Sequence, residues 1–406
     1  MKSINKLLSL ILVVIFGTCN ILLINATTPQ KITPSGIKVI SDNEVTAYNN
    51  QHMVVTGNEQ TGQKLFFIAN DISYGDELWV SDGTLAGTKM VKDIYPGTYG
   101  SGIKNITAFN NKVIFHARGD DNSGYEPWIS DGTASGTYMI KDLHPGKSRP
   151  AMFRQINENQ FVFAARDCDS ETAGAMGQYW LWISDGTPNG TQLLSQISVG
   201  VPGSIEEKTG IHLLKSGNKI FLRANDKLES KGFELWATDG SSEGTILISD
   251  INTTQGTISG TTQSSNVSWM VNCNDQKLFF TADESGESGV PWSVNSNTQE
   301  TKKLVASGKY GTKASNPFLF GNKVFFSAFL NDNSGNELFC WDINSDEATF
   351  LKEINSGTAS CGFSGMGIIG DRLFFKAIPE GSTYRLFYTD GSASFTSQYP
   401  HATSIA

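Results

Sequence analysis

Basic residues are scarce in this chain of 406 amino acids, which has 31 Lys and Arg against 40 Asp and Glu. Only 17% of the residues are charged, and the formal net charge is −9 at pH 7. A nucleic-acid-binding protein needs a basic footprint, and an anionic membrane surface attracts basic segments. The composition therefore argues against both kinds of partner. Self-repulsion at this charge favours solubility, and we expect a monomer.

Long apolar runs are absent after the N-terminus, so no later segment reaches membrane-spanning length. The first residues are different: two lysines precede an apolar run over 7–16, and Ala26 offers a small residue for cleavage. This pattern predicts a secretory signal peptide over residues 1–26 and an extracellular protein. An uncleaved anchor is the alternative, since residues 7–24 approach the length of a span. Without residues 1–26 the net charge is −11, from 29 basic and 40 acidic residues.

Cysteine is rare, with five residues in the chain. Cys19 lies in the predicted signal, which leaves Cys168, Cys273, Cys340 and Cys361. No two of them have the Cys-x-x-Cys spacing of structural zinc sites, so none is expected. Four cysteines in an exported chain predict two disulfide bonds, with three pairings open.

Catalytic motifs are missing as well. The sequence has no HExxH motif and no GxSxG nucleophile elbow. None of the five histidines is paired at metal-ligand spacing, and His116 lies in a stretch typical of a buried strand. We therefore assign no catalytic, cofactor-binding or metal-binding residue.

Glycine and aromatic residues are plentiful, with 41 Gly and 11% aromatics, which favours many short strands and turns. They are organised in a repeat. The segment "ELWVSDGTLAGTKMVKDI" (77–94) recurs as "EPWISDGTASGTYMIKDL" (126–143), "WLWISDGTPNGTQLLSQI" (180–197) and "ELWATDGSSEGTILISDI" (234–251). Degenerate copies follow as "VPWSVNSN" (290–297), "ELFCWDI" (337–343) and "RLFYTDGS" (385–392).

Two markers give the same count of seven copies. One aromatic residue marks each copy, and we expect these side chains to fill the space between neighbouring units: Trp79, Trp128, Trp182, Trp236, Trp292, Phe339 and Phe387. A second marker precedes each copy: "KLFFIA" (64–69), "KVIFHA" (112–117), "QFVFAA" (160–165), "KIFLRA" (219–224), "KLFFTA" (277–282), "KVFFSA" (323–328) and "RLFFKA" (372–377).

Each copy predicts four strands. In residues 105–143 they are "ITAF", "KVIFHA", "EPWIS" and "TYMIKDL", and Asn110 and Asn111 form the first hairpin turn. The second strand is nearly all apolar, so both of its faces should be buried. The fold class predicted is all-β, a seven-bladed β-propeller of four-stranded antiparallel blades over 45–403. The blades, called repeats 1 to 7 below, span 45–97, 98–146, 147–202, 203–256, 257–308, 309–357 and 358–403, after an N-terminal segment (27–44) that could close the ring. An open β-solenoid or paired β-sandwiches are the rival architectures.

The "ELW-x-SDGT-x-x-GT" units resemble the ELWxxDGT repeat family of exported, propeller-like proteins. The match is specific over residues 77–251 and degenerate over 257–400. The resemblance implies an extracellular repeat scaffold, and it supplies no catalytic residues to transfer.

The repeated acids have structural and functional readings. Asp82, Asp131, Asp185, Asp239 and Asp390 each precede glycine, where an aspartate can close a turn by accepting backbone N–H groups. Calcium needs six to eight oxygen ligands, and each turn offers one carboxylate. A second set of acids, Glu77, Glu126, Glu234 and Glu337, closes an Asn- and Asp-rich loop. A divalent ion such as calcium is the alternative there to a glutamate bonded within the scaffold.

Four sequons are candidates for N-glycosylation if the source cell glycosylates: Asn105, Asn189, Asn252 and Asn266.

These observations favour a secreted binding module for a glycan or protein ligand. A polysaccharide-acting hydrolase or lyase, with acids gathered at the central channel, is one alternative. A structural surface or matrix protein is another. Insertions in repeat proteins map to loops, often on the binding face, and here they fall at 168–179, 201–210, 227–232 and 253–268. We therefore expect the ligand surface on repeats 3 to 5.

Overall fold

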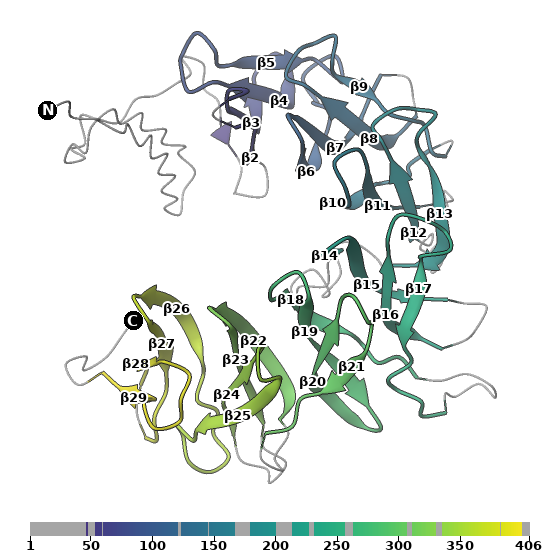
Figure 1. Ribbon diagram of the computed structural model, residues 1–406. Coiled ribbons are helices and arrows are strands. Elements are labelled where there is room, and N and C mark those ends of the chain that lie inside the picture. Colours follow the sequence, from purple (N-terminus) through teal and green to yellow (C-terminus); the bar gives the residue numbers. More distant parts are fainter. Residues whose placement is uncertain are drawn as a thin grey trace, which may run out of the picture. The chain divides into compact units, whose positions relative to one another are not determined.

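The computed structural model describes residues 46–47, 53–58, 60–120, 123–144, 146–166, 179–199, 213–226, 231–255, 263–306, 311–329, 335–381 and 383–399 (Figure 1). The predicted signal peptide, the segment 27–44, Cys168 and most of the four insertions lie outside these residues. The regular structure in the described part of the chain consists of strands without a helix. Accordingly, no described helix has the length and apolarity needed to cross a membrane.

The chain forms two compact units, Met1–Leu193 and Leu194–Ala406. The strands of the first unit are β1 (Thr46–Ala47), β2 (Met53–Thr56), β3 (Lys64–Asp71), β4 (Gly75–Ser81), β5 (Lys89–Lys92), β6 (Lys104–Phe109), β7 (Lys112–Arg118), β8 (Tyr125–Ser130), β9 (Tyr138–Met139), β10 (Ala151–Gln155), β11 (Phe161–Arg166) and β12 (Tyr179–Ser184). The boundary between the units falls within β13 (Gln192–Ser198).

The remaining strands belong to the second unit. They are β14 (Leu214–Ser216), β15 (Lys219–Asn225), β16 (Phe233–Thr238), β17 (Ile246–Ser249), β18 (Ser268–Asn272), β19 (Lys277–Glu284), β20 (Glu287–Asn295), β21 (Thr301–Lys303), β22 (Thr312–Phe320), β23 (Lys323–Phe329), β24 (Asn336–Asp342), β25 (Glu347–Lys352), β26 (Ser364–Ile369), β27 (Arg372–Ala377), β28 (Arg385–Thr389) and β29 (Ser397–Gln398).

Neighbouring strands pair antiparallel, and each sheet corresponds to one sequence repeat except in repeats 3 and 4, where β10–β17 form one eight-stranded sheet through the pairing of β13 with β15. Sheets of four strands are formed by β6–β9, β18–β21, β22–β25 and β26–β29, and β14–β17 pair in the same order. In the first repeat β1 and β2 pair with the same edge of β3, so together they serve as its first strand. The predicted all-β class, built from four-stranded antiparallel sheets, is confirmed.

The second strands of repeats 2 and 3 are largely buried. In repeat 3, every residue of β11 is buried, and in repeat 2 the five residues from Val113 to Ala117 are. Burial of both faces agrees with the continuous apolar pattern of "QFVFAA" and "KVIFHA". The hairpin turns also follow the sequence: Asn110 has a φ of 55° and Gly217 a φ of 59°, the left-handed region that Asn and Gly tolerate best.

The fourth strand of repeat 2 is shorter than predicted. The sequence indicates a strand over 137–143, but β9 contains Tyr138 and Met139 alone. Met139 pairs with Trp128, and the next residue along β8 is Pro127, which has no N–H to donate. The Pro127 carbonyl still accepts a hydrogen bond from Ile140 N at 2.7 Å. The ladder therefore stops at the proline, although the chain stays alongside β8.

The first strand of several sheets contains a β-bulge that was not predicted from the sequence. The register shifts between Lys104 and Thr107 in β6, and equivalent shifts interrupt β10, β18 and β26. A residue with positive φ lies in each bulge: Asn105, Met152, Trp269 and Gly365. A bulge adds a residue to one strand and increases its local twist. Its recurrence marks it as a built feature of the repeat.

Candidate functional site

The repeated aspartate closes a tight turn. In repeat 2, Asp131 Oδ1 accepts hydrogen bonds from Thr133 N at 2.8 Å and from Thr133 Oγ1 at 2.7 Å. The same Thr133 hydroxyl accepts from Gly136 N at 2.9 Å, and Thr137 Oγ1 donates to Thr133 O at 2.6 Å. Ser130 and Thr137 join their hydroxyls across the base of the turn at 2.7 Å. The motif "SDGTxxGT" is thus a closed hydrogen-bond circuit.

The same aspartate bonds recur in the other copies. Asp82, Asp185, Asp239 and Asp390 each accept from the backbone N–H and the hydroxyl of the residue two positions on. The hydroxyl of Thr84 is the main cause that lowers the pKa of Asp82. Such a pKa describes an ionised turn acceptor with its hydrogen bonds already made.

Two members of this set were missed in the sequence. Asn295 Oδ1 accepts from Asn297 N and Thr298 N at 2.9 and 3.0 Å, and Asp342 Oδ1 does the same for the two residues that follow Ile343. Both lie three residues after their marker aromatic, Trp292 and Phe339. That spacing was the available signal. It was hidden because the glycine and threonine of the motif are absent in repeats 5 and 6.

The recurring glutamate is fully buried. Glu126 Oε2 accepts from Leu143 N at 3.0 Å and from Ser148 Oγ at 2.6 Å, while Oε1 accepts from Ser148 N at 3.0 Å. Glu77, Glu234 and Glu337 are also at 0% exposure and bond the chain that leaves the fourth strand. The glutamate therefore ties its sheet to the connection that leads into the next repeat.

In three repeats, the buried glutamate also bonds a serine that precedes the first strand of the following repeat. Ser101 bonds Glu77, Ser148 bonds Glu126 and Ser265 bonds Glu234. In repeat 6 the place is taken by Cys361, whose N–H donates to Asn336 O at 2.8 Å. Sequence reasoning missed these partners, because they follow their glutamate by 22 to 31 positions, with no fixed spacing.

Burial raises the pKa of Glu77, Glu126, Glu234 and Glu337 to about 7, and the hydrogen bonds they accept oppose that shift. A second acid adds to the rise in each case, for example Asp93 beside Glu77. These groups could exchange protons near neutral pH, but they have no exposed surface with which to touch a ligand. Among the described residues, no three His, Cys, Asp or Glu side chains gather as a set that could hold a metal ion.

Lysines of repeats 1, 2, 4, 5 and 6 donate hydrogen bonds to the turn of the following repeat. Lys64, the first residue of the "KLFFIA" marker, donates to Asp131 O at 3.0 Å, and Lys92 donates to Thr137 O at 3.0 Å. The Lys92 ammonium also lies 5.7 Å from the centre of the Trp128 ring. Equivalent bonds start from Lys141, Lys219, Lys277, Lys323 and Lys352.

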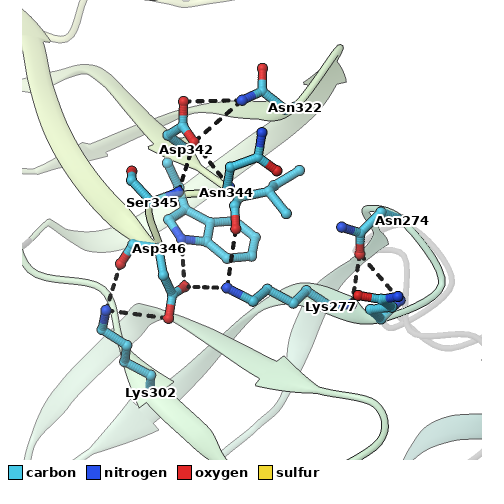
Figure 2. A network of polar contacts seen from close by, with 11 residues as sticks. Asn274, Lys277, Lys302, Asn322, Asp342, Asn344, Ser345 and Asp346 are labelled. Carbon is cyan, nitrogen blue, oxygen red and sulfur yellow. Dashed lines mark hydrogen bonds and ion pairs between the residues drawn. The ribbon is translucent and has the colours of Figure 1, made fainter.

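Figure 2 shows the most elaborate of these bridges, between repeats 5 and 6. Lys277 and Lys302 approach the carboxylate of Asp346 at 3.3 Å each. Asp346 Oδ1 also accepts from the indole N–H of Trp341 at 3.1 Å. Lys277 further donates to Ile343 O at 3.1 Å. Repeat 6 thus replaces the missing "DGT" circuit with an ion-paired turn.

Five of the seven marker aromatics pack in apolar clusters between successive repeats. Trp128 of repeat 2 belongs to a cluster with Phe66, Leu78 and Val80 of repeat 1. Corresponding clusters between later repeats include Trp182, Trp292, Phe339 and Phe387. Trp236 is buried opposite Leu222. Trp79 clusters with side chains of its own repeat, including Phe67 and Met90.

The expected disulfide bonds are not present. Cys273, Cys340 and Cys361 are free and buried, so two bonds, which need all four cysteines, cannot form. Each of the three thiols packs in an apolar cluster between repeats, and burial raises its pKa to about 12. The even cysteine count was therefore misleading: these side chains act as small core residues.

The sequons lie in different surroundings. Asn189 is exposed on the Asp185 turn, Asn105 is exposed within β6, and Asn266 is exposed just before β18. Asn252 is only 4% exposed; its Nδ2 donates to Ser264 O at 3.2 Å and its Oδ1 accepts from Thr254 N. A glycan has no room at Asn252 in the folded protein, so that candidate is withdrawn.

His116 is a core residue of the second repeat. It is 7% exposed, its Nδ1 lies 3.2 Å from Pro150 O, and its ring packs against the Tyr125 ring at a tilt of 33°, with 4.7 Å between centres. Burial lowers its pKa to about 4. A neutral imidazole donating to a carbonyl is a structural link, as the sequence led us to expect.

The surface that varies among repeats is formed by the loops between the second and third strands and those between successive repeats. In the first repeat these loops, 70–76 and 95–101, carry strongly exposed apolar side chains: Ile72, Tyr74 and Tyr99. No recurring hydrogen bond of the scaffold uses these three side chains. They are the best candidates for a functional surface in the described part of the chain.

Comparisons with known proteins give no family assignment: no protein-family model and no curated protein matched this chain. Among solved structures, a puromycin hydrolase is 12% identical with a TM-score of 0.41, and the match covers 84% of this chain and 50% of that one. The chain thus spans about half the length of that hydrolase.

Two further structures match over most of their own length. The β-propeller domain of the Trilobed protease from Pyrococcus furiosus is 12% identical, with a TM-score of 0.36 and coverage of 75% of this chain and 82% of that one. An oligogalacturonate lyase from Vibrio parahaemolyticus is 10% identical, with a TM-score of 0.35 and coverage of 88% and 85%. Likeness at this level transfers no activity.

Proposed function

We propose that this protein is a secreted, seven-bladed β-propeller of the ELWxxDGT repeat kind that acts as a binding scaffold for a glycan or protein ligand. One observation carries the proposal. The residues that recur from repeat to repeat are engaged in hydrogen bonds within the scaffold, as Asp131 and Glu126 illustrate. Function then belongs to the connecting loops, where the repeats differ.

The buried glutamates weigh against a polysaccharide hydrolase or lyase built on them. Acid–base work at a sugar needs two carboxyl groups that reach the glycosidic bond. Glu77, Glu126, Glu234 and Glu337 are at 0% exposure, and their oxygens accept backbone N–H groups. Binding is therefore the function we favour over catalysis.

The insertions of repeats 3 to 5 are our first proposal for a ligand surface. The loop over 256–262 offers a clean test, because its two ends already meet: Gln263 N donates to Thr254 O at 3.0 Å. Replacing 256–262 by two glycines should leave the sheets intact. Binding of the full chain to a glycan array and to extracellular proteins in pull-downs should fall in this variant. Unchanged binding would remove this loop from the proposed surface.

The closed ring is testable separately. A compact chain of roughly 380 residues has a radius of gyration of about 21 Å. Small-angle scattering from the full chain should give a value near that, after allowance for the N-terminal residues. A clearly larger radius with an elongated distance distribution would favour the open solenoid.

A further inference from the structure

Three exposed side chains stand on two loops of the first repeat. Ile72 is 91% exposed and Tyr74 42%, both in the loop 70–76, and Tyr99 is 85% exposed in the loop 95–101. Ile72 and Tyr99 in particular contribute little to folding, because the stabilisation from an apolar side chain comes from its burial. Gathered exposed apolar groups mark interaction sites more often than chance.

The two loops are clamped together by glycines. A Cβ atom placed on Gly75 would lie 2.4 Å from Gly100 N, and one on Gly100 would lie 2.3 Å from Asp76 N. Ser101 N also donates to Asp76 O at 3.1 Å. Tyr74 and Tyr99 immediately precede these two glycines, so the backbones that carry them lie side by side. The tyrosines are therefore presented from a fixed base, which limits the entropy lost on binding.

Repeats 2 and 6 keep this clamp without the aromatics. Gly124 and Gly335 make the corresponding close approaches to the next loop in repeats 2 and 6. The residue before Gly124 is Ser123, and Ala359 takes the place of Tyr99 in repeat 6. The clamp thus belongs to the scaffold, and the tyrosines are an addition of the first repeat.

Polar side chains lie at the base of the same loop. Asn70 Nδ2 donates to Asp76 Oδ1 at 2.8 Å, and Asp71 Oδ1 accepts from Ser73 N at 2.8 Å. A carboxylate has about four acceptor positions, so these bonds leave capacity for further donors. The surface therefore combines aromatic faces with hydrogen-bond acceptors that are already oriented.

We infer that this surface is a subsite for a neutral glycan, with Tyr74 and Tyr99 stacking on sugar rings and Asp71 and Asp76 accepting from hydroxyl groups. This rests on the proposed function, ligand binding, and names the class of ligand. A sugar offers an apolar C–H face and a polar edge, which matches amphipathic tyrosines above acids. The carboxylates disfavour acidic polysaccharides and anionic lipids. A stable protein interface engages about 20–30 residues a side, far more than this patch provides.

The test uses the full chain and titration calorimetry against neutral hexasaccharides: cellohexaose, xylohexaose, mannohexaose, maltohexaose, laminarihexaose and chitohexaose. Hexagalacturonate serves as the acidic counterpart. The variants are Tyr99→Ala and Tyr99→Phe, and the control is Leu85→Ala, which shortens an apolar side chain 51% exposed in the same repeat. Circular dichroism checks that each variant folds.

We expect at least one neutral hexasaccharide to bind and hexagalacturonate to bind more weakly. Tyr99→Ala should weaken binding about tenfold or more, and Tyr99→Phe and Leu85→Ala should keep it. Neutral-glycan binding that survives Tyr99→Ala would overturn the subsite while leaving the proposed function standing. Binding only to phosphatidylcholine vesicles or only to a captured protein, with no hexasaccharide bound, would overturn the glycan assignment.

Discussion

The carboxylate of Asp131 occupies the space in which a side chain on Gly136 would have to lie: a Cβ atom at Gly136 would be 2.2 Å from Asp131 Cγ. The φ of Gly136 is not in the left-handed region, so the backbone there does not require glycine. Glycine is needed because a side chain would clash with Asp131. The same relation joins Asp82 to Gly87, Asp185 to Gly190 and Asp239 to Gly244. The aspartate of "DGTxxGT" therefore requires the second glycine, because its carboxylate fills the space of a side chain there.

This relation predicts a non-additive pair of substitutions. Asp131→Ala should lower the free energy of unfolding by about 1–2 kcal/mol through lost turn hydrogen bonds, without changing ligand affinity. Gly136→Ala should cost a similar amount through the clash. In the double variant the carboxylate is gone, so the alanine at 136 should cost much less than it does alone. Chemical denaturation of the four proteins measures the coupling, and simple additivity would contradict it.

The buried glutamate predicts a pH-dependent stability. The pKa of Glu126 is about 7 in the folded chain against an ordinary 4.5, so its contribution is fully present below pH 4.5 and lost as the pH rises through 7. Between pH 5 and 8 the wild type should lose on the order of 2 kcal/mol relative to Glu126→Gln.

The measurement is urea unfolding of both proteins at several pH values, with Ser148→Ala as a companion that removes one donor. A flat difference between wild type and Glu126→Gln would mean that the N–H and O–H donors keep the carboxylate ionised despite its burial.

His116 should act in the opposite direction. Its pKa is lowered to about 4 from 6.5, so its contribution is present above pH 6.5 and lost as the pH falls toward 4. His116→Gln keeps an N–H for Pro150 O but removes the titration. From pH 7.5 to 5 the wild type should lose about 2 kcal/mol relative to this variant. Parallel pH profiles would show that the imidazole has the same pKa in the folded and the unfolded chain.

The lysine bridges predict a cost between repeats. Lys92→Met keeps the aliphatic stem but removes the bond to Thr137 O and the charge near the Trp128 ring. We expect a loss of about 1 kcal/mol in the free energy of unfolding. Lys89→Met, at an exposed position of the same strand, is the control and should change little. Equal effects at both positions would remove the special role of Lys92.

The buried thiols predict the outcome of a thiol titration. Cys273, Cys340 and Cys361 should be unreactive toward a disulfide reagent in the native protein, because burial raises their pKa to about 12. In denaturant without reductant, at least three thiols per chain should react. Reaction of none of Cys168, Cys273, Cys340 and Cys361 would restore the prediction of two disulfide bonds.

Much of the repeat scaffold could be predicted from the sequence because it depends on residues close together in the chain. An aspartate before glycine bonds the residue two positions on, so the turn-closing role of Asp82 and Asp131 could be predicted from the local sequence. The partner of Glu126, Ser148, lies 22 positions away in a loop of variable length, and Lys64 reaches a carbonyl 67 positions on. Such contacts depend on how successive repeats pack, which no local pattern encodes. The tyrosines of the first repeat were overlooked for the opposite reason, since a search for recurrence passes over what occurs once.

The lysine bridges between repeats described above all run one way, from a side chain in an earlier repeat to a carbonyl in the next. During synthesis the earlier repeat emerges first, at about 5–20 residues per second. Its ammonium groups then remain hydrated for several seconds, until the following turn has been made and can accept them. A repeat that carries such a lysine therefore gains these bonds only after the next repeat has been made, and a chain truncated before that next repeat would lack them.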